Sequence, residues 1–243
     1  MRAVILAAGD GGRLRPLTDT RPKVLLPIRE RPLITYPLAA LISEGITDIA
    51  VVVGYRARQV MDTLPPWVPD ARIEFIYNPA YLGGNAVSLG AARDFVGDEP
   101  FVLCMGDHII HGNVVAGLLA AHDALVVLGI DSAASLDSQL NDATRVLVDD
   151  DGRLLRIGKG LETWNAVDIG VFRLRPEIFV TLDRLYERHG DELELNDLMQ
   201  FLASHAPPVA TCDVDGLYWT DVDTVEDYRS AEETLESLDA VGL

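Results

Sequence analysis

The chain has 243 residues, of which 49% are apolar and 24% are charged, and its formal net charge is −18. This composition is typical of a globular protein and excludes a disordered chain. The acidic balance argues against a nucleic-acid partner, because proteins bind nucleic acid through basic patches. No apolar stretch approaches the roughly 20 residues that span a bilayer, so we expect a cytoplasmic protein with no membrane partner.

In the first half of the chain, apolar runs of strand length alternate with amphipathic segments of helix length. The expected strands are 3–9, 48–54, 72–77 and 101–107, and the expected helices are 32–45, 56–64 and 85–96. This alternation predicts βαβ units and a mostly parallel sheet. The apolar runs 3–6, 49–53 and 101–105 are continuous, which is typical of strands that have helices on both faces. We therefore expect a doubly wound α/β fold of the Rossmann-like type.

The second half of the chain has a different pattern. Residues 145–158 predict two strands around an Asp-Gly turn, and residues 165–175 predict a further strand. Segments 176–189 and 224–238 carry apolar residues at helical spacing, and Thr224 is a candidate N-cap of the second of these helices. Together with the first half, these elements predict a mixed sheet flanked by helices.

A glycine-rich segment follows the first predicted strand. Gly9, Gly11 and Gly12 allow backbone N–H groups to face a phosphate and let it approach closely, because they carry no Cβ. Arg13 and Lys23 add fixed positive charge to the same segment. In α/β sheets, ligands bind beyond the carboxyl ends of the strands. The segment therefore predicts a triphosphate site, because nucleotidyl transfer depends on positioning phosphate groups and neutralising their oxygens.

Three other interpretations compete with this one. A dinucleotide-binding fingerprint requires G-x-G-x-x-G at the start of a helix, whereas Pro16 and Pro22 prevent a regular helix here. A Walker A loop requires G-x-x-x-x-G-K-[ST], but Lys23 stands between Pro22 and Val24. A plain glycine-rich turn with surface charges is the remaining alternative, and the length of the loop and its place at a strand end argue against it.

The segment resembles the signature of the sugar-phosphate nucleotidyltransferases, LAAG-x-G-x-R-L followed by P-x-T and P-K. The matching positions are Gly9, Gly11, Arg13, Leu14, Pro16, Thr18, Pro22 and Lys23. In that family the LAAG backbone packs on the nucleotide base and cradles its phosphates, the arginine holds the departing pyrophosphate and the lysine binds phosphate oxygens. The resemblance implies that Arg13 and Lys23 are catalytic. It also implies nucleotide-binding residues at Leu6, Ala7, Ala8, Gly9 and Gly11.

Asp107 directly follows a predicted strand, so it emerges at the same sheet edge as the glycine-rich segment. An oxygen ligand at that edge suits Mg²⁺, which binds proteins through one or two carboxylates plus substrate phosphates. The alternative is an aspartate of a turn or helix cap. The neighbouring His108 and His111 are expected to be polar loop residues rather than metal ligands.

Two aspartates near the carboxyl terminus are further candidate magnesium ligands. Asp221 and Asp223 lie two residues apart, hence on one face of an extended segment. The resemblance implies that Asp107 and one late aspartate hold the metal together, with Asp221 ranked before Asp223, and that Asp107 contributes to nucleotide binding. Alternatively, one of the late pair caps the final helix.

The segment between these aspartates supplies candidates for binding an acceptor substrate. Lys159 is a lone cation in an apolar and acidic neighbourhood, and its flexible charge suits an acceptor phosphate. Asn165 and Asp168 offer an amide and a carboxylate to the hydroxyl groups of a polyol. The alternatives are a solvated hairpin lysine and polar residues at a strand edge. We assign Lys159 to catalysis and acceptor binding, and Asn165 and Asp168 to acceptor binding.

The segment 78–95 stands where the base-specifying loop of such enzymes lies. Its candidates for nucleotide contacts are Asn78, Gly83, Asn85 and Ser88. The motifs GNAVSL, MGDH, IGK, WNAVD-x-GVF and DVDT together resemble the inositol-1-phosphate cytidylyltransferases more than the hexose-1-phosphate thymidylyl- or uridylyltransferases. This second resemblance spans most of the chain and implies CTP as the donor.

The resulting hypothesis is a single nucleotidyltransferase domain, 1–243, with a nucleotide-binding half near 1–110 and an acceptor-binding half near 111–243. With Mg²⁺, it transfers a nucleotidyl group from CTP to inositol-1-phosphate and releases pyrophosphate. The alternatives are a sugar-1-phosphate uridylyl-, guanylyl- or thymidylyltransferase, and a nucleotide-binding regulatory subunit without turnover. The expected partners are a nucleoside triphosphate and a small phosphorylated alcohol or sugar, and the sequence leaves homo-oligomer formation open.

Overall fold

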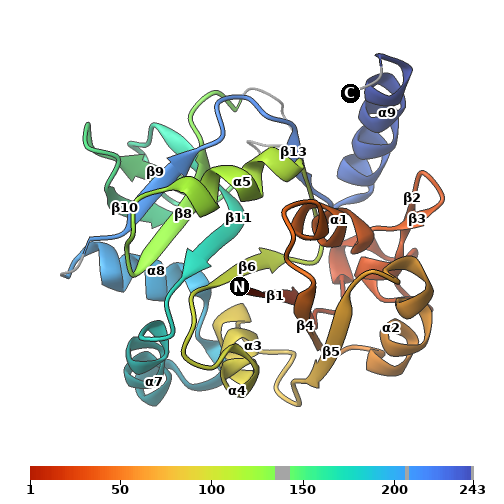
Figure 1. Ribbon diagram of the computed structural model, residues 1–243, viewed down its shortest axis with the longest axis horizontal. Helices are drawn as coiled ribbons and strands as arrows, with labels where there is room; N and C mark the ends of the chain where they lie inside the picture. The colour runs from red at the N-terminus through yellow and green to blue at the C-terminus, as the bar shows by residue number, and fades with distance from the viewer. Residues whose placement is uncertain (135–142, 206–207, 242–243) are drawn as a thin grey trace.

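A mixed β-sheet forms the centre of the computed structural model, which describes residues 1–134, 143–205 and 208–241 (Figure 1). The strands of this sheet are β1 (Arg2–Ala7), β4 (Asp48–Val53), β5 (Arg72–Tyr77), β6 (Phe101–Met105), β8 (Val126–Asp131), β9 (Arg145–Val148), β10 (Leu154–Gly158), β11 (Ala166–Leu174) and β12 (Ala210–Asp213). Within the described residues these nine strands follow the order β10-β9-β11-β6-β1-β4-β5, with β8 beside β11 and β12 beside β8.

The first half of the chain contributes the parallel part of the sheet. β1 pairs in parallel with β4 and β6, and β4 pairs in parallel with β5. In this register Leu6 lies between Val52 and Met105. Every residue of β1 and β4 except the first is buried, which confirms that the continuous apolar runs form strands covered on both faces. The loops that follow β1 and β6 therefore emerge at the same edge of the sheet.

The second half contributes antiparallel strands. β11 pairs antiparallel with β6, β8 and β9. β9 and β10 form the expected antiparallel hairpin, and Gly152 in its turn has φ +73°, the left-handed region that favours glycine. Because β11 runs opposite to β6, the beginning of β11 lies near the end of β6.

Helices cover both faces of the sheet (Figure 1). On one face lie α3 (Asn85–Ala91), α4 (Arg93–Val96), α7 (Ile178–His189) and α8 (Leu195–Ala203). On the other face lie α1 (Thr35–Ser43), α2 (Ala57–Thr63) and α5 (Gly112–Ala120). The expected doubly wound, mixed α/β fold is thereby confirmed. Among the described helices, none is long and apolar enough to cross a membrane.

The helices of the structure have somewhat different bounds from the expected ones. A short hairpin precedes α1 and consists of β2 (Pro27–Ile28) and β3 (Arg31–Pro32). The expected helix 32–45 therefore begins only at Thr35, because Pro32 belongs to that hairpin. The expected helix 85–96 is divided into α3 and α4, because the backbone at Ala92 leaves the helical region, with φ −88° and ψ 1°. The helix expected from residue 176 begins two residues later, at Ile178.

The last helix, α9 (Val225–Val241), stands apart from the sheet and packs on the β2–β3 hairpin (Figure 1). The Thr224 hydroxyl accepts a hydrogen bond from the Asp227 backbone N–H at 3.2 Å, and the Asp227 carboxylate accepts one from the Thr224 N–H at 2.7 Å. This reciprocal pair is a capping box and confirms the expected N-cap. The Tyr228 hydroxyl donates to the carbonyl oxygen of Pro27 at 2.6 Å. The helix thereby fixes the segment that precedes it.

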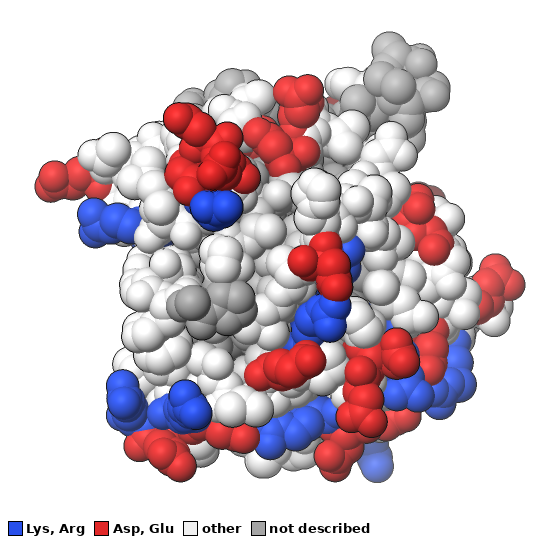
Figure 2. All heavy atoms as spheres, turned by 60° about the vertical axis from the view of Figure 1, so that its left-hand side comes forward, with Lys and Arg blue, Asp and Glu red and all other residues white. Residues whose placement is uncertain are grey.

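Acidic and basic side chains lie side by side on the face that Figure 2 presents. Ion pairs between surface side chains of the described residues include Arg93 with Asp183 and Arg175 with Asp123. Exposed ion pairs contribute little to folding stability, because water screens them and because ordering two long side chains costs entropy.

In contrast to these exposed ion pairs, the buried Arg173 is expected to contribute to the stability of the fold. Arg173 in β11 donates to the carbonyl oxygens of Leu119, Ala121 and His122, at 3.1, 3.1 and 2.5 Å. Arg173→Met leaves these oxygens without their donor, so we expect the free energy of unfolding to fall by about 3 kcal/mol. Urea denaturation measures it. The matched control Arg175→Met, at the exposed pair, should change it little, and equal losses in the two variants would contradict the interpretation.

Candidate active site

The glycine-rich segment after β1 borders a cavity of about 450 Å³. Its lining includes Leu6, Ala7, Gly9, Gly11, Gly12, Arg13, Lys23, Asp107 and Asp223. Gly11 has φ +64°, and a Cβ at this position would lie 2.7 Å from the Cβ of Lys23. A side chain at position 11 would therefore displace Lys23. Ala8 is buried, and its carbonyl oxygen accepts a hydrogen bond from the backbone N–H of Tyr55 at 2.9 Å.

The ammonium group of Lys23 is buried between two carboxylates. Its Nζ lies 2.7 Å from Oδ2 of Asp107 and forms a second ion pair with Oδ1 of Asp223. Nη2 of Arg13 lies 2.5 Å from the other oxygen of Asp223. Burial lowers the pKa of Lys23, but the charges of Asp107 and Asp223 outweigh it and raise the pKa above its ordinary value. Burial acts to raise the pKa of Asp107, and Lys23 and His108 hold it below its ordinary value. Lys23 and Asp107 are therefore both charged at neutral pH.

A histidine next to Asp107 packs into the same cluster. Nδ1 of His108 lies 2.7 Å from Oδ1 of Asp107. Burial lowers the pKa of His108, but the hydrogen bond to Asp107 and its charge raise it above the ordinary value. Gly170 has φ +70°, and a Cβ there would lie 2.5 Å from Nε2 of His108, so the imidazole occupies the space that a side chain would need. His108 belongs to β7 (His108–Ile110) and not to a loop, whereas His111 lies in the exposed connection between β7 and α5, as expected, and serves as the N-cap of that helix.

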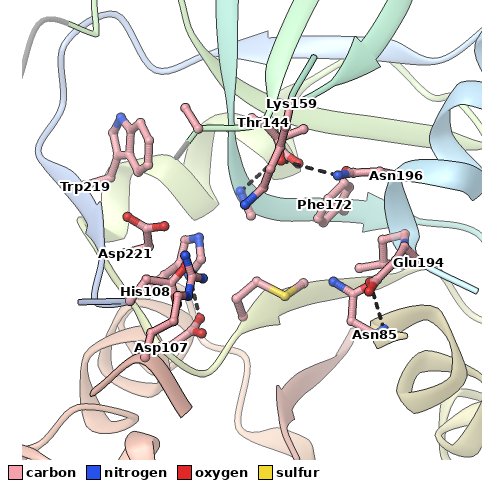
Figure 3. Close-up of a pocket in the computed structure, with 17 residues that line it drawn as sticks. Asn85, Asp107, His108, Thr144, Lys159, Phe172, Glu194, Asn196, Trp219 and Asp221 are labelled. Carbon is pink, nitrogen blue, oxygen red and sulfur yellow. Dashed lines mark hydrogen bonds and ion pairs between the residues drawn. The ribbon is translucent and has the colours of Figure 1, made fainter. Parts of the chain in front are cut away.

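A second cavity, of about 520 Å³, adjoins the first, and Arg13, Asp107 and Asp223 line both. Figure 3 shows side chains from both halves of the chain around it. Its lining also includes Asn85, His108, Thr144, Lys159, Asp168, Phe172, Glu194, Asn196, Trp219 and Asp221. The two cavities thus meet at a wall of charged groups, an arrangement suited to two ligands that react there. We name them the glycine-loop cavity and the larger cavity.

The late aspartates reach this wall through a two-stranded ribbon. β13 (Trp219–Asp221) pairs antiparallel with β7 and places Asp221 opposite His108. Burial raises the pKa of Asp221 to about 6, and the charges of Asp223 and Asp107 add to the increase. Asp223 makes the ion pairs described above, whereas Asp221 faces the larger cavity (Figure 3). The structure therefore brings both late aspartates together with Asp107.

The three predicted acceptor residues lie in different places. Lys159 and Asp168 line the larger cavity. Burial raises the pKa of Asp168 to about 6, although its hydrogen bond from the Gly170 N–H, 2.7 Å long, acts to lower it. The amide of Asn165 instead bonds to both backbone groups of Val148, at 2.9 and 2.8 Å. Asn165 therefore holds β9 against the start of β11, and the structure does not bring it to the larger cavity.

Of the residues in segment 78–88 that the sequence predicts to contact the nucleotide, one lines a cavity and the others are engaged by the protein itself. Asn78 and Ser88 are buried, and the amide of Asn78 donates to the Ser88 hydroxyl at 2.9 Å. At Gly83 a Cβ would lie 2.1 Å from the carbonyl oxygen of Asp191, so close packing explains this glycine. Of the four predicted residues, Asn85 lines the larger cavity. The other three hold the surrounding chain in place.

The residues of the larger cavity that are absent from the predictions include four whose side chains can form hydrogen bonds: Thr144, Glu194, Asn196 and Trp219. The amide of Asn196 donates to the hydroxyl of Thr144 at 3.4 Å. Nε1 of Trp219 donates to the buried carboxylate of Asp131 at 2.8 Å, which fixes the indole ring. Trp219 lies two residues before Asp221, a predicted magnesium ligand, so its place in the sequence could have indicated it. The other three belong to no motif, because distant parts of the chain bring them together.

The profile of the family described as "Nucleotidyl transferase" matches residues 2–237. A low-salt glycan biosynthesis nucleotidyltransferase of Haloferax volcanii is 30% identical over 239 residues, which cover 96% of this chain and 65% of the relative. A bifunctional IPC transferase and DIPP synthase of Rubrobacter xylanophilus is 36% identical over 234 residues, 95% of this chain and 51% of the relative. A glucose-1-phosphate thymidylyltransferase of Streptomyces antibioticus is 30% identical over 259 residues, 98% of this chain and 67% of the relative. The chain thus spans 51% to 67% of the length of these relatives.

Solved structures share the fold. The inositol-1-phosphate CTP transferase from T. maritima superposes with a TM-score of 0.86 at 24% identity, over 97% of this chain and 96% of that one. The CTP:phosphocholine cytidylyltransferase from Streptococcus pneumoniae superposes with a TM-score of 0.73 at 23% identity, over 96% of this chain and 98% of that one. At these identities the similarity concerns the fold alone.

The raised pKa of Asp168 predicts a pH-dependent effect on stability. Because the pKa of this carboxyl in the folded protein is about 6, above its ordinary value, the folded state binds the proton more tightly, and stability falls as the pH rises through 6. Asp168→Asn keeps an oxygen for the Gly170 N–H and has no charge to bury. We expect its melting temperature to exceed that of the wild type by about 3 °C at pH 8, with a smaller difference at pH 5. Calorimetric melting at both pH values measures this, and an equal difference at both would contradict it.

Proposed function

Because the chain belongs to the nucleotidyl transferase family, we propose that it joins a nucleoside triphosphate to a small phosphorylated alcohol or sugar, with Mg²⁺, and releases pyrophosphate. The observation that carries this proposal is the buried Lys23, held between Asp107 and Asp223 where the two cavities meet. A triphosphate in the glycine-loop cavity and an acceptor in the larger cavity would bring their phosphates together at this ammonium group.

The reaction needs neither a protein nucleophile nor a protein base. A phosphate oxygen of the acceptor attacks the α-phosphorus of the triphosphate, and the bond to the oxygen that bridges the α- and β-phosphates breaks. Pyrophosphate leaves with that electron pair. A phosphomonoester is already anionic near neutral pH, so the protein contributes orientation and positive charge. In the proposal the loop Gly9–Gly11 cradles the triphosphate, Arg13 holds the departing pyrophosphate and Lys23 contacts oxygens of the reacting phosphates.

The finer assignment is CTP as the donor and inositol-1-phosphate as the acceptor. It is supported by the similarity to a bifunctional IPC transferase and DIPP synthase and by the fold shared with an inositol-1-phosphate CTP transferase. Lys159 is proposed to bind the acceptor phosphate, and Asp168 to bind an acceptor hydroxyl. We leave Asn165 out of the acceptor site, because its amide is engaged by Val148.

The donor set fits a magnesium ion. Among the described residues, no group of three or more His, Cys, Asp or Glu side chains is arranged to hold a metal. Mg²⁺ nevertheless binds through one or two carboxylates and completes its shell with substrate phosphates and water. Asp107 would supply one carboxylate, and Asp221 or Asp223 would supply the second. When bound, the ion would neutralise the charge of the phosphate oxygens during transfer.

A panel experiment tests the reaction and its substrates. Purified protein is incubated with Mg²⁺ and each of CTP, UTP, GTP and dTTP against inositol-1-phosphate, glucose-1-phosphate and phosphocholine, and pyrophosphate release is measured. We expect release with CTP and inositol-1-phosphate. Release with glucose-1-phosphate and UTP, GTP or dTTP would instead favour a sugar-1-phosphate nucleotidyltransferase, an alternative supported by the thymidylyltransferase relative. Triphosphate binding in calorimetry with no release across the panel would point to a regulatory subunit.

Metal dependence is tested with aspartate variants. We expect EDTA to abolish pyrophosphate release and Asp107→Asn to lower kcat by about 100-fold or more, because a carboxylate that holds both the metal and Lys23 is lost. Asp123→Asn, at an exposed ion pair outside both cavities, is the control and should keep kcat. Undiminished turnover of Asp107→Asn would refute its role. Asp221→Asn and Asp223→Asn are compared in the same assay. The variant that needs a higher Mg²⁺ concentration for half-maximal rate identifies the second metal ligand.

A further inference from the structure

Two helix N-termini from opposite halves of the chain meet beside the larger cavity, and each is capped by the other. The side-chain oxygen of Asn85, the first residue of α3, accepts a hydrogen bond from the backbone N–H of Leu195, the first residue of α8, at 2.7 Å. The carboxylate of Glu194 accepts one from the backbone N–H of Asn85 at 3.0 Å. Each contact satisfies a backbone donor that a helix leaves unpaired at its start. We call this arrangement the cross-cap.

Backbone contacts on both sides make the cross-cap rigid. The N–H of Gly84 donates to the carbonyl oxygen of Asp191 at 2.7 Å, and the N–H of Ala86 donates to that of Leu193 at 3.2 Å. A Cβ at Gly84 would lie 2.1 Å from the Leu193 oxygen, so the two segments touch backbone to backbone. Asn85 therefore has a fixed position relative to α8.

The cross-cap also fixes which atom of Asn85 faces the larger cavity. A backbone N–H can only donate, so the Asn85 atom that contacts Leu195 N must be the amide oxygen. The amide nitrogen then points the opposite way, and Figure 3 shows it directed into the cavity that Asn85 lines. Within the described part of the chain this nitrogen has no protein acceptor. A neutral donor of fixed orientation is therefore presented to whatever occupies the larger cavity.

The chemistry of the surrounding wall indicates the kind of ligand atom that this donor meets. The cations Arg13, Lys23 and Lys159 supply the positive charge for phosphate groups. On the side of the cavity that carries Asn85, the lining includes the carboxylate of Glu194, the ring of Phe172 and, farther away, the uncharged polar groups of Asn196 and Thr144 (Figure 3). Such a wall suits hydroxyl groups, which both donate and accept, rather than a second anion.

We propose that Asn85 is a specificity-determining residue for the acceptor: its amide nitrogen donates a hydrogen bond to a hydroxyl oxygen of the phosphorylated alcohol or sugar. This inference rests on the proposed function, which supplies that acceptor. It differs from the nucleotide contact that the sequence predicts for the same residue. The cross-cap keeps the amide in one orientation, so the donor is preorganised before the acceptor arrives.

Two variants separate the proposed contact from the cross-cap. N85D keeps an oxygen for the Leu195 N–H, since Asp is as good a cap as Asn, but it loses the donor and gains a charge. N85A loses both the donor and the cap and adds no charge. Calorimetry measures the affinity of the wild type and both variants for inositol-1-phosphate, glucose-1-phosphate and CTP, and thermal melting reports on the cap. Pyrophosphate release is measured separately.

We expect both variants to bind the acceptor that the wild type prefers about 5- to 10-fold more weakly, with CTP affinity unchanged and the melting temperature lowered in N85A only. Wild-type acceptor affinity in N85A would overturn the proposal, because any loss in N85D would then come from charge repulsion. If N85D binds the acceptor as tightly as the wild type, the proposal is overturned, and Asn85 serves only the cross-cap. If either variant loses affinity for CTP, the proposal is overturned in favour of a nucleotide contact. A wild type that binds neither phosphorylated compound would also overturn it. The expected affinities without pyrophosphate release would support the role of Asn85 and refute the proposed reaction.

Discussion

The burial of one lysine between two aspartates is the interaction on which the rest of the site depends. Lys23 comes from the segment after β1, Asp107 from the end of β6 and Asp223 from the segment before α9, so three distant parts of the chain meet at one ammonium group. An isolated charge removed from water costs several kcal/mol, and the two carboxylates offset that cost for the ammonium group. The cluster also marks the point at which the two cavities join.

Sheet topology explains why these particular residues meet. β1 and β6 are parallel neighbours, so the glycine-rich segment and Asp107 emerge at one edge. Because β11 runs antiparallel to β6, its first residues, which include Asp168, return to that edge. The β7–β13 ribbon brings the end of the chain back to the same place, and the capping box of α9 fixes it there. The site thus combines strand ends of the main sheet with a separate two-stranded ribbon.

The sequence predicts those parts of the site that local rules determine. Asp107 and the glycine-rich segment could be placed because a buried strand ends immediately before each. The spacing of Asp221 and Asp223 indicates a shared face, but not that Asp223 pairs with Lys23 while Asp221 lies opposite His108. Asn165 and Asn78 have the residue type of ligand-binding amides, yet each is engaged by protein atoms that no motif reveals. The cross-cap joins residues more than a hundred positions apart, and only the folded chain brings them together.

Gly170 places a constraint of another kind on this protein. Its backbone takes a left-handed conformation, and the imidazole of His108 fills the volume beside it. A side chain at position 170 would meet the imidazole of His108 and Cγ of Met105, and its backbone would be strained even where space is made for it. A smaller residue at position 108 would therefore lift only part of the restriction, and the remainder lies in the backbone of residue 170 itself.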